Sequence, residues 1–174
     1  RYGDPSEQTM TFAADSGNST FTVDSGFGFD KILVALGALA LNNDLDVVQN
    51  DTDTELLFDL PVTGVGGINK SGAGLLTLDG AATFDGDIVV SAGTVTITNG
   101  ITFKIGANGT NNQISGTGTV ELEGAVSFNL ADAGLTLNDS WVIIDDANLS
   151  SLTANITSID VVDGASFTED SPGV

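Results

Sequence analysis

Glycines divide the segment from Gly66 to Ile97 into short runs of alternating apolar and small polar residues. Its sequence reads GGINKSGAGLLTLDGAATFDGDIVVSAGTVTI. Alternation of this kind predicts strands with one buried face, and glycine supplies the positive φ angles that the tight turns between them need. A chain built this way folds as closely spaced short strands, arranged either in the coils of a β-solenoid or in a β-sandwich.

Strand signals of the same kind follow one another along the rest of the chain. The run from Ile32 to Leu41 is rich in Ala and Leu, which favour a helix, but Gly37 interrupts it and an Asn-Asn turn follows it. We therefore expect strands there, at 31–36 and 38–41, and an all-β fold. The other expected strands lie at 9–13, 19–23, 45–48, 55–60, 75–78, 88–90, 94–98, 101–105, 118–123, 126–130, 135–137, 141–144, 156–162 and 166–168.

The spacing of the turns favours a β-solenoid over a sandwich. Turn signals recur at intervals of roughly 6 to 12 residues, which is short for a sandwich. Aromatic residues make up only 6% of the chain, and Val, Ile, Leu and Ala can fill a narrow coil interior without bulk. Coils of about 20 residues and about 4.8 Å rise would give roughly eight coils in a single domain over residues 1–174. A β-sandwich is the alternative.

The charge balance excludes several classes of partner. The 174 residues include 24 acidic and four basic ones, for a formal net charge of −20. Such a surface repels phosphate backbones and anionic lipids, so we expect neither nucleic-acid binding nor membrane binding. No apolar run approaches the roughly 20 residues that span a bilayer. The absence of cysteine excludes disulfides and thiolate metal sites. Both ends look cut, and we expect a processed piece of a longer secreted precursor.

The residues needed for catalysis are scarce, so we predict that the chain is not an enzyme. It has no histidine, which excludes every mechanism that needs an imidazole base. Polysaccharide lyases of this shape usually rely on basic residues along a carbohydrate cleft, which four scattered basic residues cannot build, and Trp141 and Tyr2 are too few for a sugar-stacking platform. Trp141 lies among apolar neighbours and is expected in the core or in a coil cap.

An acidic row offers one candidate metal site. Asp51, Asp53 and Glu55 are spaced by two, so an extended chain would present the three carboxylates on one face. Calcium prefers six to eight oxygen ligands, which such a row and nearby carbonyls could partly supply. A solvated acidic face is the simpler interpretation, because no EF-hand loop or calcium-binding nonapeptide repeat is present.

The glycine-rich segment that begins at Gly66 also resembles a known repeat. GGINKSGAGLLTL, from Gly66 to Leu78, is similar to the start of the autotransporter-associated β-strand repeat, G-G-x-x-K-x-G-x-G-x-L-x-L. The continuation from Gly80 to Val95 is similar to its second half, with Ala82, Phe84 and Val95 where Asn, Tyr and Leu are common. The resemblance covers about a fifth of the chain and implies a right-handed parallel β-helix in an exported bacterial protein, with no chemistry of its own. Lys70 occupies the repeat's lysine position, where we expect a solvated scaffold residue whose charge meets nearby Asp side chains.

Two hypotheses of function follow. The first is a passenger-like acidic rod of an extracellular or cell-surface bacterial protein, in contact with neighbouring segments of that protein. The second is a subunit of an extracellular filament or matrix that joins other copies end to end. In the second, the strands within residues 1–24 would pair with a neighbour's open edge through Thr9, Phe12, Phe21 and Val23. We expect no cofactor unless calcium binds the acidic row.

Overall fold

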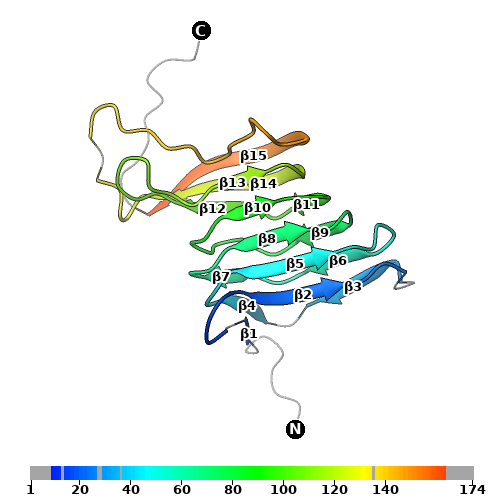
Figure 1. Cartoon of the computed structure of the whole chain (residues 1–174). Coiled ribbons are helices and arrows are strands. Elements are labelled where there is room, and N and C mark those ends of the chain that lie inside the picture. Colours follow the sequence, from blue (N-terminus) through cyan, green and yellow to red (C-terminus); the bar gives the residue numbers. More distant parts are fainter. Residues whose placement is uncertain (1–8, 13, 27–28, 36, 135, 164–174) are drawn as a thin grey trace.

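The structure is a computed structural model that describes residues 9–12, 14–26, 29–35, 37–134 and 136–163, with backbone alone for 9–12 and 163. This part of the chain contains fifteen strands and no helix. The strands stack in parallel from β1 at one end to β15 at the other (Figure 1). The described residues therefore include no helix long and apolar enough to cross a membrane.

Each coil passes through three sheets in turn. The first sheet contains β1 (Thr9–Phe12), β4 (Ala38–Leu41) and β7 (Val62–Gly64). The second contains β2 (Ser19–Val23), β5 (Leu45–Gln49), β8 (Ile68–Ser71), β10 (Ile88–Val90) and β13 (Ile114–Gly116). The third contains β3 (Lys31–Val34), β6 (Glu55–Phe58), β9 (Leu75–Leu78), β11 (Thr94–Ile97), β12 (Ile101–Lys104), β14 (Thr119–Asn129) and β15 (Ser151–Asp163). Isolated parallel bridges pair Val62 of β7 with Ala82 and Ala82 with Ile101 of β12. The first sheet is thereby continued, through Ala82, as far as β12.

The interior consists of aliphatic side chains stacked in register from coil to coil. In the second sheet, Leu45, Ile68, Ile88 and Ile114 face one another in succession, and each is at most 1% exposed. The third sheet has an equivalent ladder that includes Leu56, Leu76, Val95 and Val120. All pairs of named strands are parallel, so the fold is an all-β parallel solenoid and not a sandwich of antiparallel sheets. The right-handed sense of the coil stays a prediction.

The length of a coil changes along the stack. Ile68 lies opposite Ile88, twenty residues later, as the predicted coil of about 20 residues requires. Towards the ends the coils are longer, since Ser19 lies opposite Leu45 and Thr119 opposite Ser151. Loops inserted between the strands take up the extra residues. The described residues therefore make fewer coils than the roughly eight expected from spacing alone.

Most of the expected strands are present, two expected regions differ, and β7, β8 and β13 are strands beyond those expected. The run from Ile32 to Leu41 forms β3 and β4 and no helix. The two strands expected at 118–123 and 126–130 are one strand, β14, in which Gly124 has φ +85° and the register to β15 shifts after it. The strands expected at 135–137 and 141–144 are wrong, because 136–143 lies in a loop and Ile144 makes only an isolated bridge to Ile114. The strand expected at 166–168 lies outside the described residues.

Candidate functional site

The acidic row does not form the extended strand on which the calcium prediction depended. Residues 52–54 form a bend, and one Asp51 carboxylate oxygen accepts the N–H groups of Asp53 and Thr54, at 2.9 and 3.1 Å. Asp51 is buried inside this bend, whereas Asp53 is exposed. Among the described residues, no three acidic, His or Cys side chains come together as a possible metal site. Calcium binding at this corner stays a prediction, without a preformed group of ligands to support it.

Glu55 is engaged in other contacts at the start of β6. One carboxylate oxygen lies 2.8 Å from the Lys31 ammonium, and the other accepts the Thr77 hydroxyl at 2.6 Å. Burial would raise the pKa of Glu55, but the hydrogen bonds from Lys31 and Thr77 and the charge of Lys31 together lower it below its ordinary value of 4.5. The carboxylate is thus ionised and paired in the folded chain.

Lys70 is buried, contrary to the solvated position expected for it. The side chain is 0% exposed and faces the interior between Val47 and Val90 of the adjacent coils. Its ammonium donates to the main-chain carbonyls of Ser71 and Gly72, both at 2.8 Å, and of Ala92 at 3.3 Å. Among the described residues no carboxylate is hydrogen-bonded to this ammonium, so the expected pairing with Asp side chains is not found. Burial lowers the pKa of Lys70 from 10.5 to about 8.

The alternation of β8 contained the signal that would have placed Lys70 inside. Successive side chains of a strand point to opposite faces, so Lys70 shares a face with the buried Ile68. The contacts of the ammonium are all to main-chain oxygens of two successive coils. Lys70 therefore joins two coils, which agrees with the scaffold role expected for the repeat's lysine. It does so as a buried residue and not as the solvated one that was expected.

The residues expected to mediate assembly belong to the first coil of the chain's own stack. Thr9 and Phe12 in β1 lie opposite Ala38 and Leu41 of β4. In β2, Phe21 and Val23 lie opposite Val47 and Gln49 of β5. The side chain of Val23 is buried, and the Phe21 ring packs edge-on against Phe58 with centroids 6.2 Å apart. These strands thus use one edge within the chain, and each is the last described strand of its sheet at that end.

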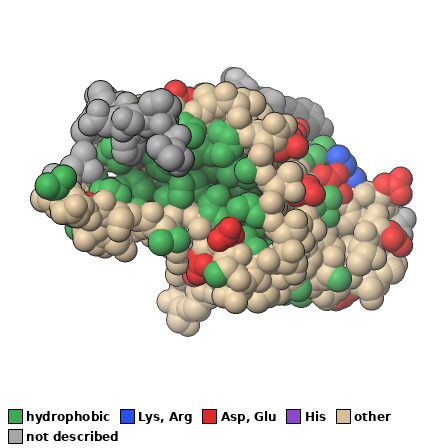
Figure 2. Space-filling view, turned by 90° about the horizontal axis from the view of Figure 1, so that it is seen from above, with side chains coloured by type: hydrophobic (Ala, Val, Ile, Leu, Met, Phe, Trp, Pro, Cys, Tyr) green, Lys and Arg blue, Asp and Glu red, His purple; other side chains and the backbone are tan. Residues whose placement is uncertain are grey.

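The opposite end of the stack presents both an edge and an apolar face. Among the described strands, β15 pairs only with β14, along eleven register positions. Figure 2 looks onto this end and shows hydrophobic side chains gathered across its middle. We call this surface the β15 end. It includes partly buried apolar residues that pack on the core, namely Phe128, Trp141, Ile143, Ile144, Leu149 and Leu152.

Two loops leave the solenoid at the same corner, directly after the paired ends of β12 and β14 (Figure 1). The first joins β12 to β13 at residues 105–113, and the second joins β14 to β15 at residues 130–150. Hydrogen bonds connect the two loops: Trp141 Nε1 donates to the Ala107 carbonyl at 3.0 Å, and Asn111 Nδ2 donates to the Val142 carbonyl at 2.7 Å. Trp141 is half-buried at the edge of the core and ties the loops together.

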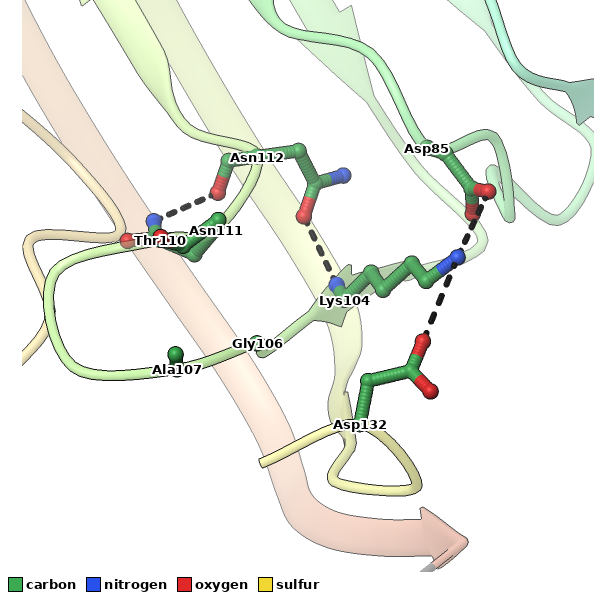
Figure 3. A pocket seen from close by; sticks show the side chains of 8 residues that line it. All are labelled: Asp85, Lys104, Gly106, Ala107, Thr110, Asn111, Asn112 and Asp132. Carbon is green, nitrogen blue, oxygen red and sulfur yellow. Dashed lines mark hydrogen bonds and ion pairs between the residues drawn. The ribbon is translucent and has the colours of Figure 1, made fainter. Parts of the chain in front are cut away.

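A pocket of about 400 Å³ lies where the first loop meets the solenoid (Figure 3). The Lys104 ammonium, at the end of β12, lies 3.0 Å from an Asp85 carboxylate oxygen and 3.6 Å from one of Asp132. The hydrogen bond and charge of Asp85, with a smaller effect of Asp132, raise the pKa of Lys104 above its ordinary value. The lining also includes Gly106, Ala107, Thr110, Asn111 and Asn112.

Asn112 is a buried residue of the pocket lining. Its side chain is 5% exposed, its carbonyl oxygen accepts the Lys104 N–H at 2.7 Å, and its amide donates to the Phe84 carbonyl at 3.0 Å. Sequence reasoning missed this site because Asp85, Lys104 and Asp132 come from three successive coils and form no local motif. The one signal in the sequence that could have pointed to Lys104 is that it is one of four basic residues in the chain.

The fold and its interior define the chain as a parallel β-solenoid with an aliphatic core. Residues 68–97, which form β8 to β11, match the family model described as Passenger-associated-transport-repeat. The match confirms the resemblance of this segment to the autotransporter-associated repeat. No curated protein and no solved structure matches the chain.

Proposed function

We propose that the chain is a non-enzymatic structural module of an extracellular bacterial surface protein, a passenger-like acidic rod that spaces or presents other parts of that protein. The observation that carries the proposal is the match of residues 68–97 to the passenger-associated repeat, in the middle of an unbroken parallel stack. In such a stack each coil contacts only its neighbours, and the number of coils sets the length.

The composition supports this role. A formal charge of −20 keeps the surfaces of neighbouring molecules apart in a crowded extracellular layer. The interior ladders are continuous from coil to coil, and close packing of this kind resists deformation. Lys70, the most reactive type of side chain in the repeat, is occupied by main-chain carbonyls. These features favour a scaffold over a catalyst.

A change of length by one coil tests the proposal. Ile68 and Ile88 occupy equivalent places, so deletion of residues 68–87 removes one coil and restores the register. The chain would be fused to a bacterial outer-membrane translocator, and its exposure on intact cells would be measured by antibody labelling and by protease treatment. We expect the one-coil deletion to be displayed like the unmodified chain, because a spacer tolerates a shorter stack.

A half-coil deletion provides the matched control. Removal of residues 68–77 would bring strands of different sheets into the same position and destroy the stacking of the ladders. We expect this variant to be degraded or retained inside the cell. Failure of the unmodified chain to reach the surface, or equal loss with both deletions, would contradict the proposal.

The end-to-end assembly remains the second candidate function. It is favoured by the apolar face at the β15 end and by strand edges that have no partner among the described strands, namely that of β15 at one end and those of β1, β2 and β3 at the other. All these strands run parallel, so a second copy placed on the β15 end would continue the same stack. Non-closing contacts of this head-to-tail kind produce a fibre.

A further inference from the structure

We propose that the Lys104 pocket is a binding site for a neutral saccharide, a function that goes beyond the structural role. The site is the pocket formed by Asp85, Lys104, Thr110, Asn111 and Asp132 at the corner where the two loops leave the solenoid (Figure 3). In repeat proteins, insertions that gather on one face often form the binding surface. Here the two insertions occur in adjacent coils and at the same corner.

Hydrogen bonds hold the walls of the pocket in place. Within the first loop, the Gly106 N–H donates to the Thr110 carbonyl at 2.8 Å, and the Asn111 amide donates to the Asn112 carbonyl at 2.8 Å. The second loop braces the first, since the Ser140 N–H donates to the Asn108 side chain at 2.9 Å. The first loop, which contributes Thr110 and Asn111 to the pocket, is therefore held in place, and this lowers the entropy cost of binding a ligand there.

The described residues that line the Lys104 pocket include no aromatic side chain on which a sugar could stack, so binding would rest on polar groups that match the hydroxyls of a sugar. The carboxylates of Asp85 and Asp132 accept hydrogen bonds, the Lys104 ammonium donates, and the Thr110 hydroxyl can do both. The amide N–H groups of Asn111 are bound to the Asn112 and Val142 carbonyls, so its side chain offers a ligand its carbonyl oxygen as an acceptor. Sugar hydroxyls also donate and accept, so each can bind between a carboxylate and a donor. Hydrogen bonds to charged groups are the stronger ones, which suits a ligand that carries no charge of its own.

The charges of the site disfavour ionic ligands. Two carboxylates and the overall charge of −20 repel an anion, so Lys104 does not constitute an anion site. A cation would have to displace the Lys104 ammonium from between its two carboxylates. A neutral ligand leaves these ion pairs in place and adds hydrogen bonds to them.

A second pocket extends the site along the solenoid. It has a volume of about 320 Å³ and shares Asp85 and Lys104 with the first. Its lining adds the hydroxyl-bearing side chains of Thr83 and Thr102 and the apolar side chain of Val162, which is 57% exposed. Two adjoining pockets that share their charged residues suit a chain of sugar units better than a single one.

The test is a titration of the folded chain, followed through its backbone amide NMR signals. The neutral probes are maltotriose and cellotriose; trigalacturonic acid and the glucosamine trimer of chitosan serve as anionic and cationic counterparts. We expect at least one neutral trisaccharide to shift the signals of Lys104, Thr110 and Asn111. We expect Lys104→Gln to lower the affinity for that trisaccharide by about tenfold or more. Absence of binding by both neutral probes, or stronger binding of a charged probe, would overturn the proposal.

Two further variants separate binding from folding. Lys31→Gln removes the other well-formed lysine–carboxylate pair, 2.8 Å from Glu55, and should leave the affinity for the trisaccharide unchanged. Thr110→Val keeps the shape of an exposed loop residue and removes its hydroxyl, so it should weaken binding even where Lys104→Gln disturbs the loops. If both Thr110→Val and Lys104→Gln bind the trisaccharide with the affinity of the unmodified chain, the proposed site is contradicted.

Discussion

The buried ammonium of Lys70 donates to the main-chain carbonyl of Ala92 in the next coil, at 3.3 Å. The same ammonium binds the carbonyls of Ser71 and Gly72 in its own coil. The repeat's lysine thus joins the turns of two successive coils from inside the stack. Because burial of the charged ammonium costs free energy, this cost should appear in the pH dependence of the free energy of unfolding.

The stability of the chain should rise with pH through the alkaline range. The folded pKa of Lys70 is about 8, whereas the unfolded chain keeps the lysine proton up to the ordinary value of 10.5. Between these values the unfolded state binds more protons, so the free energy of unfolding increases as pH rises. We expect a gain on the order of 1–3 kcal/mol between pH 7 and pH 10, measured by urea unfolding. Lys70→Met should abolish the gain; equal slopes in both proteins would show that Lys70 does not cause it.

The close approach of coils at Gly93 should make this position intolerant of any side chain. Gly93 has φ +70°, and an added Cβ would lie 2.5 Å from the carbonyl oxygens of Gly72 and Gly74. Gly109 has a similar φ of +74° but no atom within 4 Å of the added Cβ. We expect Gly109→Ala to cost about 1 kcal/mol of backbone strain, and Gly93→Ala to cost at least about 2 kcal/mol more through overpacking. Thermal unfolding measures both, and equal losses would contradict the coil–coil clash.

Calcium should not stabilise the acidic corner. The carboxylate of Glu55 is bound to Lys31 and Thr77, and an Asp51 oxygen caps the bend, so a calcium ion would have to compete for both. We expect the melting temperature to be the same in millimolar calcium and in chelator. A rise with calcium that Asp53→Asn removes would instead establish the predicted site.

A proline on the open edge of β15 tests end-to-end assembly. The Ser150 N–H donates to the Gly118 carbonyl of the neighbouring coil, and alternation along the strand then directs the Thr153 N–H to the open edge. If copies join at this edge, sedimentation should show oligomers that grow with salt, because salt screens the repulsion between chains of −20 charge. Thr153→Pro should prevent this growth, since it removes the outward donor.

Thr153→Val keeps the N–H and the strand preference, and is the matched control for the proline variant. It should assemble like the unmodified chain. Monomers at every salt concentration, or identical oligomers in all three proteins, would exclude assembly through β15.

The local pattern was sufficient to predict most strands but failed where a loop has the composition of a strand. Trp141 to Ile144 is as apolar as any strand of the chain, yet only Ile144 makes a bridge. Trp141, Ile143 and Ile144 instead pack, partly buried, over the β15 end of the core, whereas Val142 is exposed. A short apolar run can therefore belong to a loop that packs on the core as well as to a strand.

The amino-acid sequence by itself determined that this protein consists of short β-strands, because the alternation and the glycine turns are local properties of segments such as Gly66 to Ile97. The sequence favoured a solenoid over a sandwich, and the parallel pairing between coils decided for the solenoid. The tertiary structure alone decided what the side chains do. Lys70 is buried by coils that come about twenty residues before and after it. Asp85, Lys104 and Asp132 meet only because parallel stacking places three coils at one corner. In a solenoid the environment of a residue is set by its neighbours above and below, and the lengths of the intervening loops decide which residues those are.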